Sequence, residues 1–298
     1  MTEKHSHNKM NRILAVIVMY RLAPAASASY VALSHRLQTD STFRDMVELL
    51  VMDNSPGAQS LPAGSAGTYS WDGSNPGLAR RYNDALEAAT RAGATWLLLL
   101  DQDTTLTPEY LDELKTLSQR FADQQNVVAI VPKLVCGNQV YSPHGPCYRG
   151  PLPSPRLDTY GIFEGLIRPF NSGATLRVKT LQDIGGFPEA YWLDYLDHAT
   201  FHRLQEGGGD VFIMHARLEH DMSFHRLDKH LDPGNAARHS NQLDAMVRFY
   251  NEHGSASERT RLRLDLLRDA LRSLAQKHLA EAGRYLRAAV HYPAGLSK

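Results

Sequence analysis

Two acids one residue apart follow the most apolar run of the chain. Residues 96–107, WLLLLDQDTTLT, place Asp101 and Asp103 directly after uninterrupted apolar residues. A buried strand that ends this way projects carboxylates from the carboxyl edge of a sheet, where open α/β folds bind ligands. The pair therefore predicts a site for a divalent cation on a phosphorylated substrate, or for phosphoryl chemistry at the acids themselves. The alternative is a loop of solvated acids.

A second pair of acids, Asp194 and Asp197, follows Tyr191 and Trp192. Residues three apart on a helix share a face, so this pair could present one or both carboxylates to a cleft. The alternative is structural, because acids in the first turn of a helix interact favourably with its dipole.

Polar residues after two other apolar runs indicate a nucleotide. Asp53 and Asn54 follow ELLVMD, and Tyr20 ends the first run. A carboxylate at a strand end can accept hydrogen bonds from a base or ribose, and the tyrosine ring offers a flat face. Gly77 stands where a turn enters a helix and allows a close backbone approach to a phosphate. The alternatives are a tight turn at 53–57 and a glycine required for packing.

Apolar runs that read as strands alternate with segments of helical character along the first half of the chain. The predicted strands are 13–20, 46–52, 96–100 and 127–132, and the predicted helices are 29–38, 78–91 and 108–121. Thr107 is the expected N-cap of the last helix, with Pro108 at its first position. This alternation predicts an α/β fold with a doubly wound, mostly parallel sheet.

The second half of the chain is less regular. Residues 136–170 are rich in Gly, Pro, Tyr and Arg, which indicates a loop-rich insertion or a short antiparallel region beside the site. A short helix is expected at 179–184, ending at Gly185-Gly186. We expect a tail at 1–11, one domain at 12–232 and a helical region at 233–298.

Composition limits the function classes. The chain has 298 residues, 43% of them hydrophobic, so it can bury the core of one large domain. Its 32 basic and 32 acidic residues give no net field to attract nucleic acid. Cys136 and Cys147 lack any disulfide-rich context, which suits a reducing cytoplasm. No run of about 18 apolar residues predicts a membrane span, and 13–20 reads as a first strand rather than a secretion signal.

The C-terminal region carries many arginines among leucines. They are Arg259, Arg261, Arg263, Arg268, Arg272, Lys277, Arg284 and Arg287. A basic amphipathic helix can lie on an anionic membrane, which predicts peripheral contact with the inner face of the plasma membrane. The other interpretation, which we slightly prefer, is a solvated face packed against the core or against a partner subunit of a homo-oligomer.

The order of these motifs resembles that of glycosyltransferase family 2, whose members have a GT-A fold. Tyr20, VMDNS, SNPGLARRYN and LLLLDQD follow one another as they do in that family, and the resemblance covers roughly residues 12 to 225. The chain looks most similar to the rhamnosyltransferase branch. That resemblance implies transfer of L-rhamnose from dTDP-L-rhamnose, or use of another dTDP- or UDP-linked donor. The acceptor would be a saccharide or lipid-linked oligosaccharide in bacterial surface polysaccharide synthesis.

The resemblance also implies roles for individual residues. Asp53 and Asp101 would contact the nucleotide of the donor, and Asp103 would bind Mn²⁺ or Mg²⁺. Asp197 would be the general base, six residues before an arginine, although Leu196 replaces the acid that often precedes the base. Asp194 is the second choice of base, and Trp192 would contact the acceptor. His220 matches by motif position a histidine that completes the metal site in related enzymes, and His215 and His225 are the alternatives.

Two other function classes compete with this interpretation. LLLLDQDTTLT also resembles the first motif of haloacid-dehalogenase-like phosphatases, in which Asp101 would be the nucleophile. That motif normally opens its domain, whereas a long segment with nucleotide-like motifs precedes it here. The other alternative is a non-catalytic carbohydrate-binding scaffold, which the presence of Asp101, Asp103 and Asp197 disfavours.

Overall fold

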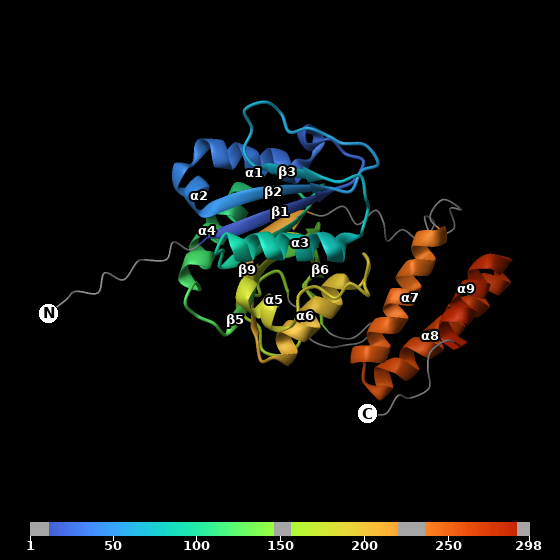
Figure 1. Cartoon of the computed structure of the whole chain (residues 1–298). Helices are drawn as coiled ribbons and strands as arrows, with labels where there is room; N and C mark the ends of the chain where they lie inside the picture. Colours follow the sequence, from blue (N-terminus) through green and yellow to red (C-terminus); the bar gives the residue numbers. More distant parts are fainter. Residues whose placement is uncertain (1–11, 146–155, 220–235, 291–298) are drawn as a thin grey trace.

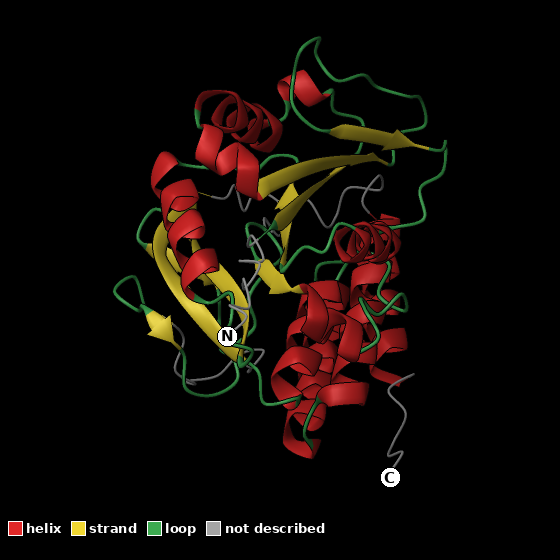
Figure 2. Ribbon diagram, turned by 60° about the vertical axis from the view of Figure 1, so that its left-hand side comes forward, coloured by secondary structure: helices red, strands yellow, loops and turns green. Residues whose placement is uncertain are grey.

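The computed structural model describes residues 12–145, 156–219 and 236–290 (Figure 1). Within these ranges the strands form one sheet in the order β3-β2-β1-β4-β8-β5-β9-β7, with β6 paired to β5. Helices cover both faces of this sheet, and three further helices follow it in the chain (Figure 2). The predicted α/β fold with a mostly parallel sheet and C-terminal helices is confirmed.

The first block of the sheet is entirely parallel. It consists of β1 (Ile13–Met19), β2 (Val47–Asp53), β3 (Thr68–Trp71) and β4 (Trp96–Asp101). Met19 pairs with Asp53, and Val18 pairs with Asp101, so the carboxyl ends of β1, β2 and β4 are level. Because the chain builds outward to β3 and then returns to the other side of β1, the topological switch point lies between β1 and β4.

The second block is mixed. The strands β5 (Val127–Cys136) and β9 (Asp210–Glu219) are parallel, and β8 (Thr175–Arg177) runs antiparallel between β4 and β5. Two short antiparallel strands, β6 (Gln139–Ser142) and β7 (Gly161–Ile162), lie in the segment predicted to be loop-rich or antiparallel. The blocks are therefore joined through three residues of β8.

Each face of the sheet has its own core. The helices on one face are α1 (Ala28–Thr39), α2 (Ser41–Met46) and α4 (Pro108–Arg120), preceded by a 3-10 turn at Pro24–Ala26. Those on the other face are α3 (Leu78–Arg91), α5 (Val178–Asp183) and α6 (Leu196–Glu206). Strands buried on both faces need apolar side chains at every position, which explains the uninterrupted run of β4.

Local signals placed several helix ends correctly. The Thr107 side chain accepts a hydrogen bond from the backbone N–H of Tyr110, with Pro108 at the first position, as predicted for α4. The short helix α5 is followed by Gly185 and Gly186, both at positive φ, as expected for a helix end. Met46 was expected in a strand but lies in α2, because the Asp40 cap starts a short helix there.

The C-terminal helices are α7 (Ala236–His253), α8 (Ala256–Ala275) and α9 (Leu279–Val290). The helix α7 buries apolar side chains, among them Phe249, in the same core as α3, α5 and α6. Polar bonds add to this contact: Tyr191 Oη donates to Glu252 Oε2 at 2.7 Å, and Arg168 Nη1 donates to Tyr250 Oη at 3.0 Å. The predicted domain boundary near 232 and the predicted tail at 1–11 lie outside the described residues. None of the described helices combines the length and apolar composition needed to cross a membrane.

Candidate active site

The acidic motif after β4 is tied to the end of β1 by its middle residue. The backbone N–H of Tyr20 donates to Gln102 Oε1 at 2.8 Å, and Gln102 Nε2 donates to the Tyr20 carbonyl at 3.3 Å. The ring of Tyr20 remains exposed. Gln102 thus holds the two strand ends together across the switch point. The Arg21 guanidinium lies over the Tyr20 ring, 5.0 Å from its centroid.

Two serines orient the turn that carries the acids. Ser29 Oγ donates to the backbone carbonyls of Asp101 and Thr104, at 2.5 and 2.8 Å, while Ser172 Oγ donates to Asp101 Oδ2. Asp103 is exposed. Carboxylates at an open sheet edge are hard oxygen donors of the kind that Mg²⁺ and Mn²⁺ prefer, so Asp101 and Asp103 suit the predicted metal. The other predicted ligand, His220, lies outside the described residues.

Asp53 is fully buried at the end of β2. Its Oδ1 accepts from the backbone N–H of Ser55 at 2.8 Å, and its Oδ2 accepts from Tyr69 Oη at 2.6 Å. Burial and the bond to Asp53 raise the pKa of Tyr69. The carboxylate therefore organises the segment between β2 and β3, and contact with a donor nucleotide stays a prediction.

Asn54 is also buried and also bonded. Arg81 of α3 donates from Nε to Asn54 Oδ1 at 2.6 Å, and from Nη1 and Nη2 to Asp72 at 3.1 and 2.8 Å. These bonds from Arg81, with those from Ser74, hold the pKa of Asp72 well below its usual value. One buried guanidinium thus links the VMDNS turn to the loop before α3. The predicted nucleotide contact of Asn54 stays a prediction.

Gly77, the residue before α3, lies against Trp192. Its φ is 95°, and a Cβ built at Gly77 would lie 2.3 Å from Cδ1 of the indole. The backbone N–H of Leu78 donates to the Trp192 carbonyl at 2.8 Å, while 48% of Trp192 stays exposed. The structure therefore brings together a residue predicted to bind the donor and one predicted to bind the acceptor.

A second contact reinforces this junction. Asn83 Nδ2 donates to the Phe187 carbonyl at 3.0 Å, and the Phe187 N–H donates to Asn83 Oδ1 at 2.8 Å. The Asn83 side chain, at the end of SNPGLARRYN, thereby acts as a short strand partner for the segment that leads to Trp192. Asn83 is a positioning residue for that segment.

The expectation that Asp194 and Asp197 share one helical face is wrong. Tyr195 has a φ of 63°, a left-handed conformation that interrupts the helix, and α6 begins at Leu196. Asp197 lies in the first turn of α6 and Asp194 precedes the helix. Burial is the main reason that the pKa of Asp194 is raised. The charge of Arg238 opposes this shift, and the charge of Asp197 adds to it.

Asp197 is held by the next residue. The backbone N–H of His198 donates to Asp197 Oδ1 at 2.7 Å, and His198 Nδ1 lies 2.7 Å from the same oxygen. Burial favours the neutral acid, but the charge and bonds of His198, with the charge of His144, lower the pKa of Asp197 below its usual value. Its side chain is 20% exposed, and Oδ2 makes no hydrogen bond to the described residues.

His198 stands in an aromatic cluster that the sequence did not reveal. The neighbouring ring centroids lie 4.7 to 6.0 Å away and belong to Tyr195, His144, Phe249 and Phe170. Burial, the largest cause, and the nearby His198 lower the pKa of His144 to about 4. His144 is therefore uncharged at neutral pH, and its charge acts on Asp197 only in acid, where both groups titrate.

A buried tyrosine connects the two acidic motifs. Burial raises the pKa of the Tyr82 hydroxyl well above its usual value, and the charges of Asp101 and Asp197 raise it further. This hydroxyl has no hydrogen-bond partner among the described residues. Acids that are far apart in the chain therefore both act electrostatically on one side chain of α3.

Arg203, six residues after Asp197, makes its hydrogen bonds to the loop after α5 and not to Asp197. Its guanidinium donates to the backbone carbonyl of Ile184 and, at 3.5 Å, to that of Gly186. The arginine thus fixes α6 to the end of α5 and orients Asp197 indirectly.

Comparison with known proteins shows the fold. No family model matches the chain, and no curated protein does. Among solved structures, the 1–349 fragment of S. aureus TarS matches with a TM-score of 0.52 and 14% identity, covering 94% of this chain and 91% of that one. The same fragment in complex with UDP-GlcNAc matches with a TM-score of 0.50 and 12% identity, with the same coverage. At these identities the likeness establishes a shared fold.

Proposed function

We propose that this protein is an inverting glycosyltransferase that moves a sugar from a nucleoside diphosphate onto a hydroxyl group. The observation that carries the proposal is the contact between the segment before Asp197 and the loop before α3, where the Leu78 N–H donates to the Trp192 carbonyl at 2.8 Å. The charges of Asp101 and Asp197 both raise the pKa of the buried Tyr82 in α3. The TarS fragment that shares this fold was crystallised with UDP-GlcNAc, a sugar activated in this way. A fold shared with that protein favours a transferase over a phosphatase or a scaffold.

The donor would lie along the carboxyl edge of β1, β2 and β4. Tyr20 offers an exposed ring beside the buried Asp53, and Gln102 holds that edge together. Asp103, with Asp101 beside it, would hold Mn²⁺ or Mg²⁺, which stabilises the negative charge of a departing diphosphate when bound. Ser172 and Ser29 keep the acidic turn in place for that purpose.

The acceptor would lie between Asp197 and Trp192. Because the pKa of Asp197 is lowered, its carboxylate is charged at neutral pH and can take a proton from a sugar hydroxyl. His198 is bonded to Oδ1 of Asp197, so we assign the role of proton acceptor to Oδ2 of the same carboxylate. Attack on the anomeric carbon from the face opposite the diphosphate inverts its configuration. Asp194 remains the second choice of base, and Trp192 offers a flat apolar surface for the acceptor.

The donor sugar is proposed from the motif resemblance alone. It points to L-rhamnose carried by dTDP, and to a saccharide or lipid-linked acceptor in bacterial surface polysaccharide synthesis. The TarS complex favours a UDP-linked sugar as the alternative. Both donors present a diphosphate to the same two acids, so the choice depends on the base and the sugar.

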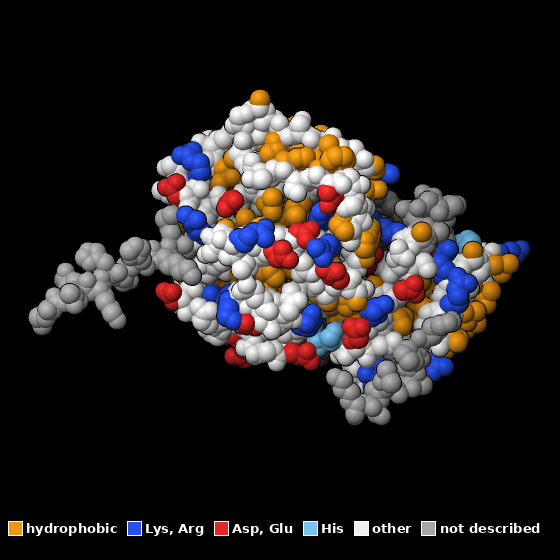
Figure 3. Space-filling view, in the orientation of Figure 1, with side chains coloured by type: hydrophobic (Ala, Val, Ile, Leu, Met, Phe, Trp, Pro, Cys, Tyr) orange, Lys and Arg blue, Asp and Glu red, His pale blue; other side chains and the backbone are white. Residues whose placement is uncertain are grey.

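Contact with a membrane or a second copy of the chain would involve α8 and α9. Their outer surface exposes Leu264, Leu271, Leu274, Leu279, Leu286 and Val290. Hydrophobic and basic surface lies side by side along this edge of the molecule (Figure 3). The arrangement supports peripheral binding to an anionic membrane at the cytoplasmic face, where a lipid-linked acceptor would be available.

Calorimetry with the full-length protein tests the proposal. Titrations of dTDP, UDP, GDP and ADP, with and without Mn²⁺, should show metal-dependent binding of dTDP, or of UDP if the alternative donor holds. The anomeric configuration of the product, measured by NMR, should be inverted relative to the donor. Hydrolysis of a simple phosphate ester without binding of any nucleotide would overturn the transferase proposal in favour of the phosphatase.

A further inference from the structure

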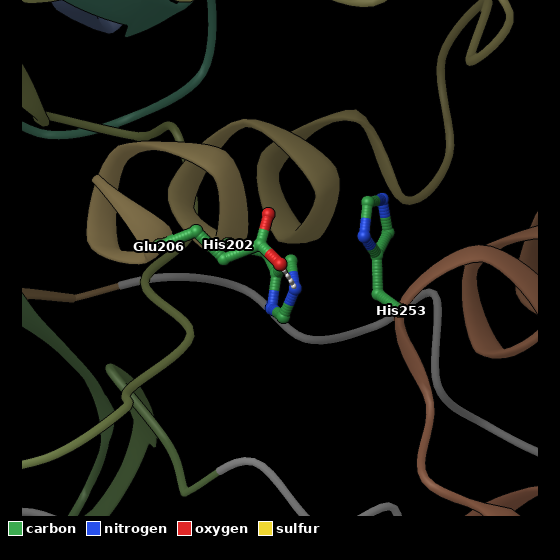
Figure 4. A group of neighbouring side chains, drawn as sticks. All are labelled: His202, Glu206 and His253. Atoms are coloured by element: carbon green, nitrogen blue, oxygen red, sulfur yellow. Dashed lines mark ion pairs between the residues drawn. The ribbon is translucent and has the colours of Figure 1, made fainter. Parts of the chain in front are cut away.

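Three side chains outside the candidate active site form a cluster of metal-binding type. His202 and Glu206 lie on successive turns of α6, and His253 reaches toward them from the last residue of α7 (Figure 4). One ligand atom from each lies within 4.8 Å of the other two. His202 Nε2 is 3.4 Å from Glu206 Oε1.

We propose that His202, Glu206 and His253 bind a Zn²⁺ ion that fastens α7 to α6. Bonds of about 2.0 to 2.1 Å in a tetrahedral site place the ligand atoms about 3.3 Å from one another. The His202–Glu206 pair already has this separation. Because all three atoms lie within 4.8 Å of one another, a side-chain movement of at most about 1.5 Å by His253 brings the third atom to the same distance.

The surroundings suit a metal more than an isolated ion pair. His202 and His253 are 14% and 16% exposed and both contact the ring of Phe249, which limits their rotation. Burial lowers the pKa of both imidazoles, so they are neutral and ready to donate a lone pair. Glu206 is 64% exposed, which leaves the fourth position open to water.

The donor set also separates this site from the acids of the sheet edge. Two imidazoles and one carboxylate favour Zn²⁺, whereas carboxylates alone favour Mg²⁺ or Mn²⁺. An ion here would reinforce the neighbouring bond between Tyr191 and Glu252, which also joins α7 to the sheet domain. Since α6 begins next to Asp197, the metal would stabilise the helix that carries the proposed base. The inference does not depend on the transferase proposal.

The test uses the full-length protein freed of metal by a chelator. Calorimetric titration with ZnCl₂ should give one fewer bound ion for Glu206→Ala and for His253→Asn than for the wild type. Glu87→Ala is the matched control, because Glu87 is an exposed helical glutamate paired four residues away with Arg91. It should bind as many ions as the wild type. Comparing the number of bound zinc ions in the wild type and in each variant removes any contribution from other histidines.

Hydrogen exchange measures whether the bound ion stabilises the contact between α7 and α6. Zn²⁺ should slow exchange at the end of α7 and in α6 of the wild type, and should leave exchange in Glu206→Ala unchanged. Glu206 is exposed, so this variant should fold normally. Equal zinc stoichiometry in the wild type and both variants, or equal protection of α7 with and without zinc, would overturn the proposal.

Discussion

The indole of Trp192 rests on the α-carbon of Gly77, so close that a methyl group at position 77 would lie 2.3 Å from Cδ1. The contact joins the loop before α3 to the segment before α6. The Leu78 N–H donates to the Trp192 carbonyl at the same place. One glycine thus determines how the proposed donor side meets the proposed acceptor side.

Gly77→Ala should therefore displace Trp192 and reduce activity sharply. Gly64→Ala is the control, because Gly64 also has a positive φ but has no atom near an added Cβ. Both variants carry a conformational cost of about 1 to 3 kcal/mol, because Gly77 at φ 95° and ψ 171° lies in a region that is essentially restricted to glycine and Gly64 also has a positive φ. The clash should add about 1 to 3 kcal/mol to the loss for position 77 alone. Urea unfolding and turnover measure the two effects, and equal losses in both variants would contradict the contact.

Asp197→Asn should lower turnover by about 10² to 10⁴-fold while nucleotide binding stays near normal, because a base is lost and the donor edge is unchanged. Asp194→Asn should have a much smaller effect. Turnover by initial rates and nucleotide affinity by calorimetry separate the roles. Near-normal turnover in Asp197→Asn would transfer the role of base to Asp194.

Asp103→Asn should weaken nucleotide binding in the presence of Mn²⁺ and leave binding without metal nearly unchanged. The loss of one negative ligand reduces metal affinity without disturbing the fold, because Asp103 is exposed. Asp45→Asn, which changes an exposed aspartate of α2, is the control and should behave as the wild type. An identical loss with and without Mn²⁺ would show that Asp103 acts by another means.

His144 should make the protein less stable in mild acid. Its pKa is about 4 in the folded protein against 6.5 as a free side chain, so between these values the unfolded chain binds a proton that the folded chain does not. The free energy of unfolding therefore falls as pH drops through this window, by at most roughly 3 kcal/mol from this residue. In His144→Gln the loss between pH 7 and pH 4.5 should be smaller than in the wild type. An unchanged loss would contradict the lowered pKa.

The parallel block could be predicted from the sequence because β1 and β4 are buried on both faces and their apolar runs are continuous, while only the exposed Glu48 interrupts the apolar run of β2. The start of α4 could also be predicted, because the Thr107 side chain accepts a hydrogen bond from a backbone N–H only three residues away. By contrast, β8 has three residues, too few for any periodicity, and its pairing depends on strands that are far away in the chain.

The candidate site shows the same division. Asp101, Asp103 and Gly77 could be proposed as site residues from the sequence because each lies at a recognisable strand end or turn. His198 and His144 were missed because their importance comes from contacts with Asp197 and with each other, and the chain has 14 histidines. The prediction that Asp194 shares a helical face with Asp197 was wrong because Tyr195, between them, has a left-handed backbone. No local sequence pattern indicates that conformation.

The antiparallel strand β8 has a consequence for the chain as it leaves the ribosome. Until β8 arrives, β4 is an edge strand of leucines with unpaired backbone groups, a surface that invites pairing with other chains. The strand β8 follows roughly 75 residues later, which at ordinary elongation rates leaves that edge open for about 4 to 15 s. The first hundred residues therefore pass through a period in which the edge of β4 is open to pairing with other chains.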